Sequence, residues 1–164
     1  MIYRKNLSIQ DASLHTTEDD YMMGSFVLLE ADGSAITDPG RGKGLRTLLM
    51  QDLDDVTTDD IEGIQKAPHR YQHFEVPTEV IFSVDENGQR TMVEITTMDR
   101  PGLLAEIGLA FQSCDVELQS AKVVTLGEKV EDVFYITNPD QSLLTGQHEL
   151  TLKMAIIDRL STND

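Results

Sequence analysis

The pattern of hydrophobic and polar positions changes its period once within a short stretch, between Thr91 and Phe111. From Thr91 to Thr97 apolar residues alternate with polar ones, as in a strand that buries one face. From Leu104 to Phe111 apolar residues recur at helical spacing. The residues between, Asp99 to Gly102, therefore predict a strand-to-helix junction, and the N-terminus of that helix carries unpaired amides.

This junction is suited to binding a small anion. Pro101 fits a first helical turn because its missing N–H costs nothing there, and Gly102 lets a ligand approach the main chain closely. The free amides and the positive end of the helix dipole can then receive a carboxylate. A purely structural alternative, which spacing alone favours, is that Asp99 caps the helix and Pro101 starts it.

An internal repeat organises the rest of the chain. Leu7–Thr16 aligns with Val116–Thr125, and in both copies the apolar phase slips by one residue midway. Such a slip is typical of a β-bulge. Each copy continues into a second strand and then an amphipathic helix, so the repeated unit is strand, strand, helix. The second strands are expected at Tyr21–Glu30 and Val130–Thr137, and the helices at Gly44–Leu53 and Gly146–Leu160.

The second copy has a further hairpin and helix before it. Val80–Val84 reads as a strand, and the Asn-Gly pair in Asp85–Gly88 is typical of a tight turn, so this strand should pair antiparallel with Thr91–Thr97. The second half then contains four antiparallel strands with two helices on one face. We predict an α+β, ferredoxin-like sandwich with one edge strand moved ahead of the first helix.

By the same count, the N-terminal copy lacks its leading hairpin and most of its first helix, of which Met1–Asn6 would be the last turn. We expect a truncated domain at residues 1–66, a proline-punctuated linker at 67–78 and a complete domain at 79–164. The sheet edge left open in the truncated domain must find a partner or stay exposed.

Composition narrows the class of protein. The chain has 164 residues, 40% of them hydrophobic, which is enough for a buried core, and it has no apolar run long enough to span a membrane. Cys114 is the only cysteine, so no disulfide can form within the chain and a reducing compartment is expected. The net charge of −16 repels phosphate and anionic lipid. We expect a cytoplasmic protein that binds neither nucleic acid nor membranes.

Catalytic and metal-binding patterns are not found in the sequence. The four histidines are scattered without ligand spacing, and no Ser/His/Asp or Cys/His grouping has support. We therefore expect no catalytic residue, no metal site and no cofactor in this chain.

The residues that carry the predicted junction and repeat also carry a resemblance. The layout resembles tandem ACT domains, the small-molecule sensors of amino-acid metabolism, and Asp99-Arg-Pro-Gly-Leu-Leu104 is similar to their ligand-loop motif. The segments His73–Val80 and Leu7–Thr16 resemble the C-terminal ACT region of the bifunctional uridylyltransferase and uridylyl-removing enzymes that act on the nitrogen regulator PII.

This resemblance implies a regulatory role. In that family, catalytic domains elsewhere in the protein use Mg and UTP to attach UMP to PII or remove it, and ACT domains sense glutamine. The expected partners are thus glutamine, PII through the parent enzyme, and other ACT units by self-association. The residues expected to contact the ligand are Met98, Asp99, Arg100, Pro101, Gly102, Leu103, Leu104, Gln119, Ser120 and Lys122.

In this mechanism, the ligand carboxylate meets the amides around Arg100–Leu103, and its side chain meets the strand that holds Gln119 and Lys122, or a neighbouring ACT unit. Arg100 either adds a charge-assisted bond or is a solvated cation paired with Asp99. Lys122 either contacts the ligand or merely protects an exposed strand edge.

Two other functions stay open. The chain could be an ACT sensor of another enzyme of amino-acid metabolism, or an ACT dimerisation module that binds no ligand. An RNA-binding function is the weakest alternative, because the strands lack exposed aromatic pairs flanked by basic residues.

Overall fold

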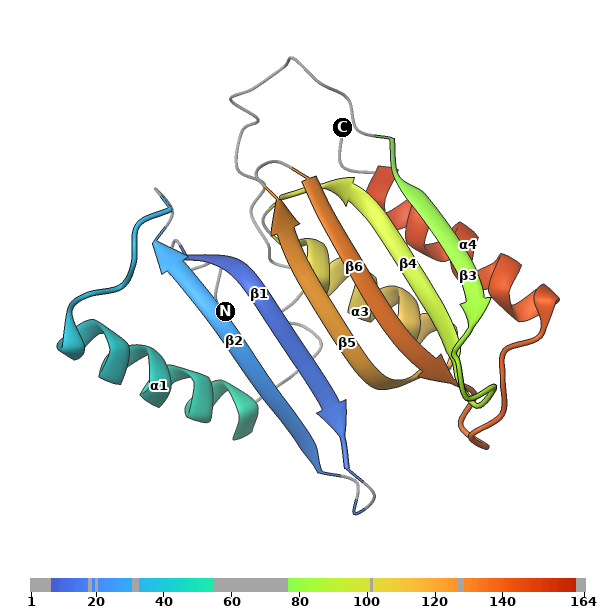
Figure 1. Ribbon diagram of the computed structural model, residues 1–164, viewed down its shortest axis with the longest axis horizontal. Helices are drawn as coiled ribbons and strands as arrows, with labels where there is room; N and C mark the ends of the chain where they lie inside the picture. Colours follow the sequence, from blue (N-terminus) through green and yellow to red (C-terminus); the bar gives the residue numbers. More distant parts are fainter. Residues whose placement is uncertain are drawn as a thin grey trace.

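In the computed structural model, the described residues are 7–17, 19, 21–30, 33–54, 77–100, 102–126 and 129–161. Within them, six antiparallel strands form one sheet in the order β2-β1-β5-β6-β4-β3, accompanied by three helices (Figure 1). The elements are β1 (Leu7–Thr16), β2 (Met22–Glu30), α1 (Pro39–Asp54), β3 (Glu79–Val84), β4 (Thr91–Met98), α3 (Leu103–Ser113), β5 (Glu117–Leu126), β6 (Lys129–Thr137) and α4 (Gly146–Ser161).

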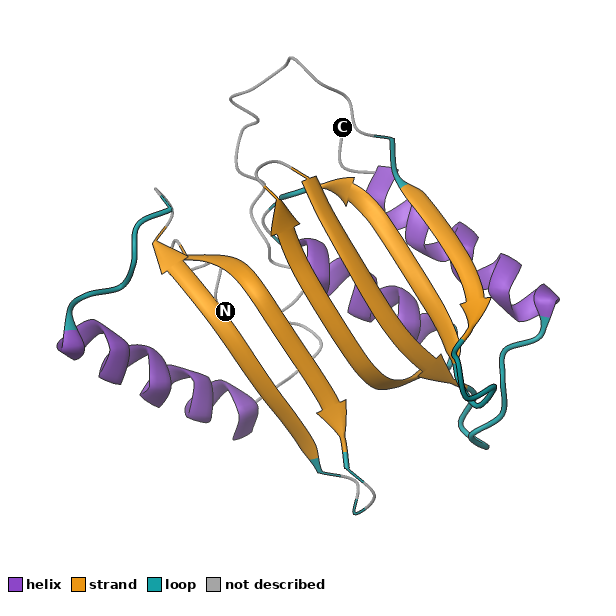
Figure 2. Cartoon of the chain, viewed as in Figure 1, coloured by secondary structure: helices purple, strands orange, loops and turns teal. Residues whose placement is uncertain are grey.

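The core lies between the strands β3 to β6 and the helices α3 and α4, which lie on the same side of the sheet (Figure 2). Residues of β4 alternate between buried and more exposed because every second side chain points at the helices. Phe111 of α3 meets Phe134 of β6 edge to face, with ring centroids 5.2 Å apart. This α+β arrangement is compatible with the predicted ferredoxin-like unit.

The predicted hairpin before β4 is confirmed. Val80 pairs with Ile95 in an antiparallel register, and Gly88 in the turn has a φ of 68°, a left-handed conformation that favours glycine. Its N–H donates to the carbonyl of Asp85 at 2.9 Å, which closes the turn.

Both predicted β-bulges are confirmed, and each places a glutamine at the irregular position. The β1–β2 register shifts at Gln10, and the β5–β6 register shifts at Gln119. The two repeat copies also pair with each other, because β1 lies antiparallel to β5. Ser13 faces Lys122 in this pairing, and these two residues are equivalent in the repeat, so a local twofold axis passes between them.

The side-chain contacts across this β1–β5 pairing obey the same symmetry. Thr16 Oγ1 donates to the carbonyl of Leu118 at 3.1 Å, and the equivalent Thr125 Oγ1 donates to the carbonyl of Ile9 at 2.9 Å. Gln10 Nε2 also donates to the carbonyl of Thr125 at 2.8 Å. The two copies are therefore joined by reciprocal contacts between matching residues.

The predicted start of the first helix is wrong. We expected the helix to begin at Gly44, but α1 begins at Pro39. The carboxylate of Asp38 accepts hydrogen bonds from the N–H groups of Gly40 at 3.0 Å and Arg41 at 3.2 Å, as an N-cap does. An aspartate followed by proline is a sequence signal for this start, because proline is preferred at the first helical position.

The predicted open edge corresponds to β2, which is the last strand of the sheet on its side. The residues expected to form the preceding helix turn, Met1–Asn6, and most of the linker, residues 67–76, lie outside the described part of the chain. Large apolar side chains are exposed along β2 and the residue before it. These are Tyr21, Met22, Met23, Phe26 and Val27.

The threonine contacts between β1 and β5 generate a stability prediction. Thr125→Val removes the hydroxyl donor to Ile9, and Thr16→Val removes the donor to Leu118, so each should lower the free energy of unfolding by about 1 kcal/mol. Thr47→Val is the control, since its exposed hydroxyl only bonds within α1. Urea denaturation measures all three, and equal effects at the three positions would contradict the prediction.

Candidate ligand-binding sites at the two ends of the sheet

The predicted junction is formed where β4 ends at Met98 and α3 begins at Leu103. Gly102 is the N-cap of α3, with φ 85° and ψ 1°, and no side chain caps this helix. The left-handed backbone explains why glycine stands here. Pro101 lies outside the described residues.

Asp99 does not cap α3, so the structural alternative for this residue is wrong. Because the cap is Gly102 and no side chain forms a hydrogen bond at this cap, the helix begins later than that alternative requires. The amide of Leu103 already donates to the carbonyl of Arg100 at 3.2 Å. An anion at this helix end would therefore rely on the amides of the first turn that follow Leu103.

Arg100 reaches the end of the other core helix. Its Nη1 donates to the carbonyl of Leu160 at 2.9 Å, and its Nη2 lies 3.4 Å from the carbonyl of Arg159. A cation at this position compensates the unpaired carbonyls and the negative end of the α4 dipole. Arg100 thus ties the junction to the C-terminus of α4, a contact that the sequence did not predict.

A buried carboxylate lies close to the junction. Asp132 of β6 pairs with Ile95 of β4 and is only 1% exposed, and no described group forms a well-aligned hydrogen bond with its side-chain oxygens. Desolvation raises the pKa of Asp132 to about 7; the main-chain N–H of Val124 opposes this rise only in part, and the charge of Asp99 adds to it. Desolvation also raises the pKa of Asp99. Asp99, which is exposed, lies three residues before the N-cap of α3, and its charge acts on the buried Asp132.

The sequence carried a signal for Asp132 that we did not use. Along β6 the side chains that face the core alternate as Val130, Asp132, Phe134 and Ile136, so one aspartate replaces an apolar residue in a buried series.

The other predicted contact residues lie on β5, toward the opposite end of the sheet. Strand β5 reaches the junction end at Leu126, and Gln119 is seven residues away along the strand, or roughly 20 Å. Ser120 donates through Oγ to the carbonyl of Leu14 at 2.9 Å. Lys122 is exposed but lies between β1 and β6, so its interpretation as protection of a strand edge is wrong.

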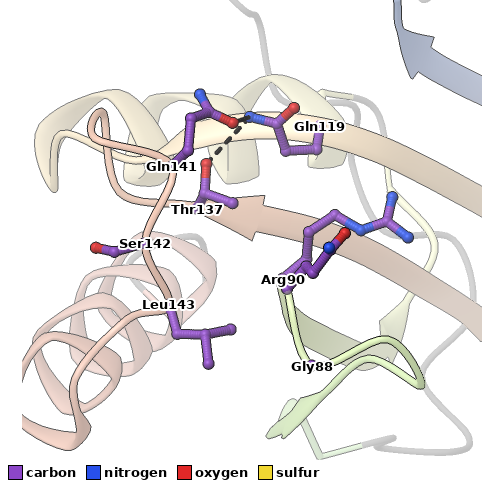
Figure 3. Close-up of a pocket in the computed structure, with 8 residues that line it drawn as sticks. Gly88, Arg90, Gln119, Thr137, Gln141, Ser142 and Leu143 are labelled. Atoms are coloured by element: carbon purple, nitrogen blue, oxygen red, sulfur yellow. Dashed lines mark hydrogen bonds between the residues drawn. The ribbon is translucent and has the colours of Figure 1, made fainter.

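An open cleft of about 550 Å³ lies at this opposite end (Figure 3). It is formed by the β3–β4 turn, the start of β5 and the loop that follows β6. The residues that line it are Gly88, Gln89, Arg90, Gln119, Thr137, Gln141, Ser142 and Leu143.

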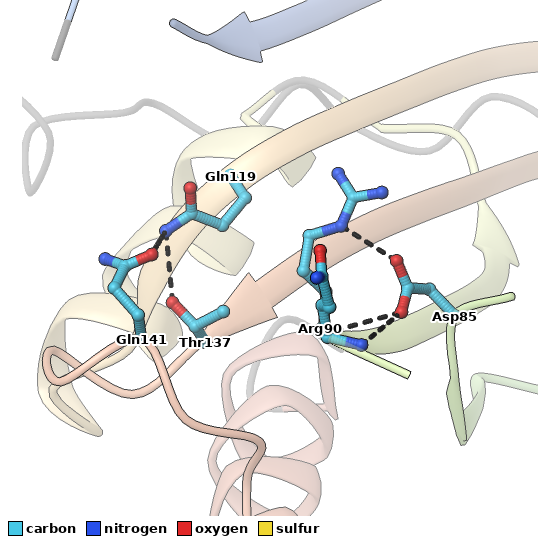
Figure 4. A network of polar contacts seen from close by, with 6 residues as sticks. Asp85, Arg90, Gln119, Thr137 and Gln141 are labelled. Carbon is cyan, nitrogen blue, oxygen red and sulfur yellow. Dashed lines mark hydrogen bonds and ion pairs between the residues drawn. The ribbon is translucent and has the colours of Figure 1, made fainter. Parts of the chain in front are cut away.

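One side of the cleft is a network of carboxamides. Gln119 donates through Nε2 to Thr137 Oγ1 at 3.0 Å and to Gln141 Oε1 at 3.2 Å (Figure 4). Gln141 in turn donates through Nε2 to Glu117 Oε2 at 2.8 Å. Gln141 has a φ of 64°, which is uncommon for a residue other than glycine and is held in place by these contacts.

The other side holds a fixed arginine. Arg90 Nε donates to Asp85 Oδ2 at 3.0 Å, and its guanidinium carbon lies 4.8 Å from the ring centroid of Tyr135. Asp85 is buried, and its carboxylate also accepts from the main-chain N–H groups of Arg90 at 3.0 Å and Gln89 at 2.8 Å. These backbone bonds, more than the ion pair, lower the pKa of Asp85.

Within the described residues, no group of three or more His, Cys, Asp or Glu side chains could hold a metal ion. In the same part of the chain, every helix is too short or too polar to cross a membrane.

The raised pKa of Asp132 predicts a pH-dependent stability. Because the folded state keeps its proton up to a pH of about 7 while the unfolded state releases it near 4, this group makes folding less favourable as the pH rises between those values. Asp132→Asn should raise the free energy of unfolding on the order of 1–3 kcal/mol at pH 8 and much less at pH 4.

Asp140→Asn is the control for this pH experiment, since hydrogen bonds from Ser142 lower the pKa of Asp140 and make its charge stabilising at neutral pH. This substitution should destabilise the fold at pH 8, the opposite sign to Asp132→Asn. Denaturation curves at several pH values measure both, and a parallel pH profile for wild type and Asp132→Asn would refute the prediction.

The Arg100 contacts predict a structural role that can be measured without any ligand. Arg100→Gln should lower the free energy of unfolding by about 1 kcal/mol, because the carbonyls at the end of α4 lose a cationic donor. Hydrogen exchange should increase most at the C-terminal turn of α4. Arg41→Gln in exposed α1 is the control and should leave exchange in α4 unchanged.

Comparison with known proteins gives a consistent set of relatives. The chain is 36% identical over 161 residues to the "Bifunctional uridylyltransferase/uridylyl-removing enzyme" of Photobacterium profundum, an alignment that covers 98% of this chain and 18% of that protein. It is 41% and 40% identical, each over 159 residues, to proteins of the same name from Pseudomonas entomophila and Stutzerimonas stutzeri. Those alignments cover 94% of this chain and 17% of each relative.

No family model and no solved structure matches the chain. The chain spans less than a fifth of the length of the curated relatives it matches. Its similarity is therefore to a short segment of bifunctional uridylyltransferase/uridylyl-removing enzymes.

Proposed function

We propose that this chain is a regulatory segment of a bifunctional uridylyltransferase/uridylyl-removing enzyme that modifies PII. The similarity runs along 94–98% of the chain but only 17–18% of three such enzymes, which supports a segment distinct from most of the parent protein. In this proposal, the catalytic domains that use Mg and UTP are elsewhere in the parent chain.

We further propose that the segment is an ACT region that senses an amino acid at the β4–α3 junction. The single observation that supports this most is that an uncapped helix N-terminus and a carboxyl group lie next to each other at this junction. The N-terminus of α3, which no side chain caps, attracts a carboxylate, and the exposed carboxyl group of Asp99, three residues before the N-cap, can accept hydrogen bonds from an ammonium group. A free amino acid carries both charged groups on one carbon.

Glutamine is the proposed ligand. Residues Met98 to Leu104 would hold the α-carboxylate and α-ammonium groups of glutamine. Gln119, Ser120 and Lys122 would contact the glutamine side chain. Since roughly 20 Å separates Gln119 from the junction within one chain, we assign that second set to a neighbouring ACT unit. A difference of about 1–3 kcal/mol in glutamine affinity between two arrangements of paired units is enough for regulation.

Assembly is the second candidate function. The apolar side chains of Met22, Met23 and Phe26 are exposed on β2, an edge strand, and such a strand is a template for pairing with another chain. A ligand-free dimerisation module would use this edge and would not respond to glutamine.

The sensor proposal predicts that Gly102→Ala weakens glutamine binding by at least about tenfold. A side chain at Gly102 strains the left-handed N-cap and obstructs approach to the amides, so the ligand carboxylate loses its site. Gly33→Ala is the matched control, because Gly33 has a φ of 81° with open space around it and lies far from the junction in sequence.

Isothermal titration of the full-length enzyme with glutamine, glutamate and serine measures this effect. The expected result is selective glutamine binding in wild type and Gly33→Ala, and loss in Gly102→Ala. Glutamine affinity that is equal in both variants would remove the junction as the binding site, and no response to any of the three amino acids would favour the assembly module.

A further inference from the structure

Within one chain, the cleft between Arg90 and Gln119 lies at the other end of the sheet from the proposed sensing junction, and a Gln119 that contacts glutamine on a neighbouring unit cannot serve this cleft at the same time. We propose that this cleft is a second binding site, for a small monocarboxylate that also carries a hydrogen-bond donor such as an amine or an amide N–H. Arg90 would bind the carboxylate and Gln119 would accept from the donor.

Arg90 is arranged to receive an oxyanion. The bond from Nε to Asp85 and the contact with the Tyr135 ring hold the guanidinium in one orientation, and the bond to Asp85 is made through Nε and not through the terminal nitrogens (Figure 4). Among the described residues, no protein atom accepts a hydrogen bond from those terminal nitrogens. Their planar pair of donors matches the two oxygens of a carboxylate, and little side-chain entropy remains to be lost on binding.

Gln119 offers a fixed acceptor. Its Nε2 donates one hydrogen to Thr137 and the other to Gln141, so both amide hydrogens are used and the carboxamide cannot turn over without losing two bonds. The opposite atom, Oε1, points away from both partners (Figure 4) and accepts no hydrogen bond from a described residue. Oε1 therefore requires a donor from a ligand or from water.

The loop after β6 forms a rigid side of the cleft. The N–H of Asn138 donates to the carbonyl of Ser142 at 2.9 Å, and the N–H of Gln141 donates back to the carbonyl of Asn138 at 2.9 Å. These bonds and the one to Glu117 hold Gln141 in its left-handed conformation. Backbone conformations of this kind concentrate at binding sites, and here the strained residue orients Gln119.

The surrounding charge selects among oxyanions. Asp85 offsets much of the charge of Arg90, Glu117 lies on the carboxamide side through its bond to Gln141, and the whole chain carries −16. A dianionic phosphate is repelled by this field, whereas a monocarboxylate with its own donor group leaves less net charge to accommodate. The shape of the site thus admits several oxyanions, and its charge favours the carboxylate.

Titration of the ¹⁵N-labelled chain followed by NMR tests this proposal. The probes are N-acetylglycine and 4-aminobutyrate, which carry a carboxylate and a donor at two spacings, with acetate and inorganic phosphate as comparisons. We expect at least one of the first two to shift the side-chain signals of Arg90 Nε–H and the Gln119 amide, with an affinity at least about tenfold above acetate and phosphate.

Two variants identify the binding groups. Arg90→Lys keeps the charge but loses the planar pair of donors, and Gln119→Ala loses the acceptor, so each should weaken probe binding by at least about tenfold. Arg41→Lys is the matched control, since Arg41 pairs with Glu30 in another part of the molecule and should bind the probes as wild type does. Backbone NMR spectra establish that each variant is folded.

The Gly102→Ala variant separates this site from the proposed sensing junction. The cleft signals should shift in that variant as they do in wild type, whether or not glutamine binding is lost. No shift with either probe, equal affinity for all four compounds, or unchanged binding in both Arg90→Lys and Gln119→Ala would each overturn the second site.

Discussion

The pairing of β1 with β5 is the interaction on which the N-terminal half of the structure depends. Of the described apolar residues in β1 and β2, only Leu7 and Ala12 are buried, which is far less than a hairpin needs to fold by itself. The β1–β2 hairpin is instead stabilised by backbone pairing with β5 and by the reciprocal hydrogen bonds from Thr16 and Thr125. The core under α3 and α4 therefore supports both repeat copies.

The same strand also separates the two candidate sites. Strand β5 runs from the cleft end of the sheet to the junction end. Its bulge sets the direction of the Gln119 side chain at the cleft end. At the other end, β6 carries the buried Asp132, and β4 leads into the uncapped start of α3. Because a bulge re-aims side chains without moving the rest of the ladder, Gln119 can serve the cleft while the strand stays paired on both sides.

Local patterns predicted the local features of this fold. Alternation along Thr91–Thr97, the Asn-Gly turn and the phase slips at Gln10 and Gln119 each depend on neighbours in sequence, and the structure confirms all of them. The capping of α4 by Arg100 joins residues about sixty positions apart, and the cleft needs three separate segments. Contacts between distant segments leave no periodic pattern in any one of them, so the sequence could not predict them. The start of α1 was predicted too late because the capping role of Asp38 is a single-residue signal outside the apolar pattern.

The residues on the local twofold axis show what fusing the two copies into one chain permits. In a dimer of identical copies, the residue at this position would face itself, and two lysines would then oppose each other on one face of neighbouring strands, which destabilises a sheet. In the single chain the two copies differ, so Lys122 faces the small, neutral Ser13. Because the two copies belong to one chain, the two residues on the axis need not be identical. A single positive charge can therefore lie at the centre of the interface without facing a second one.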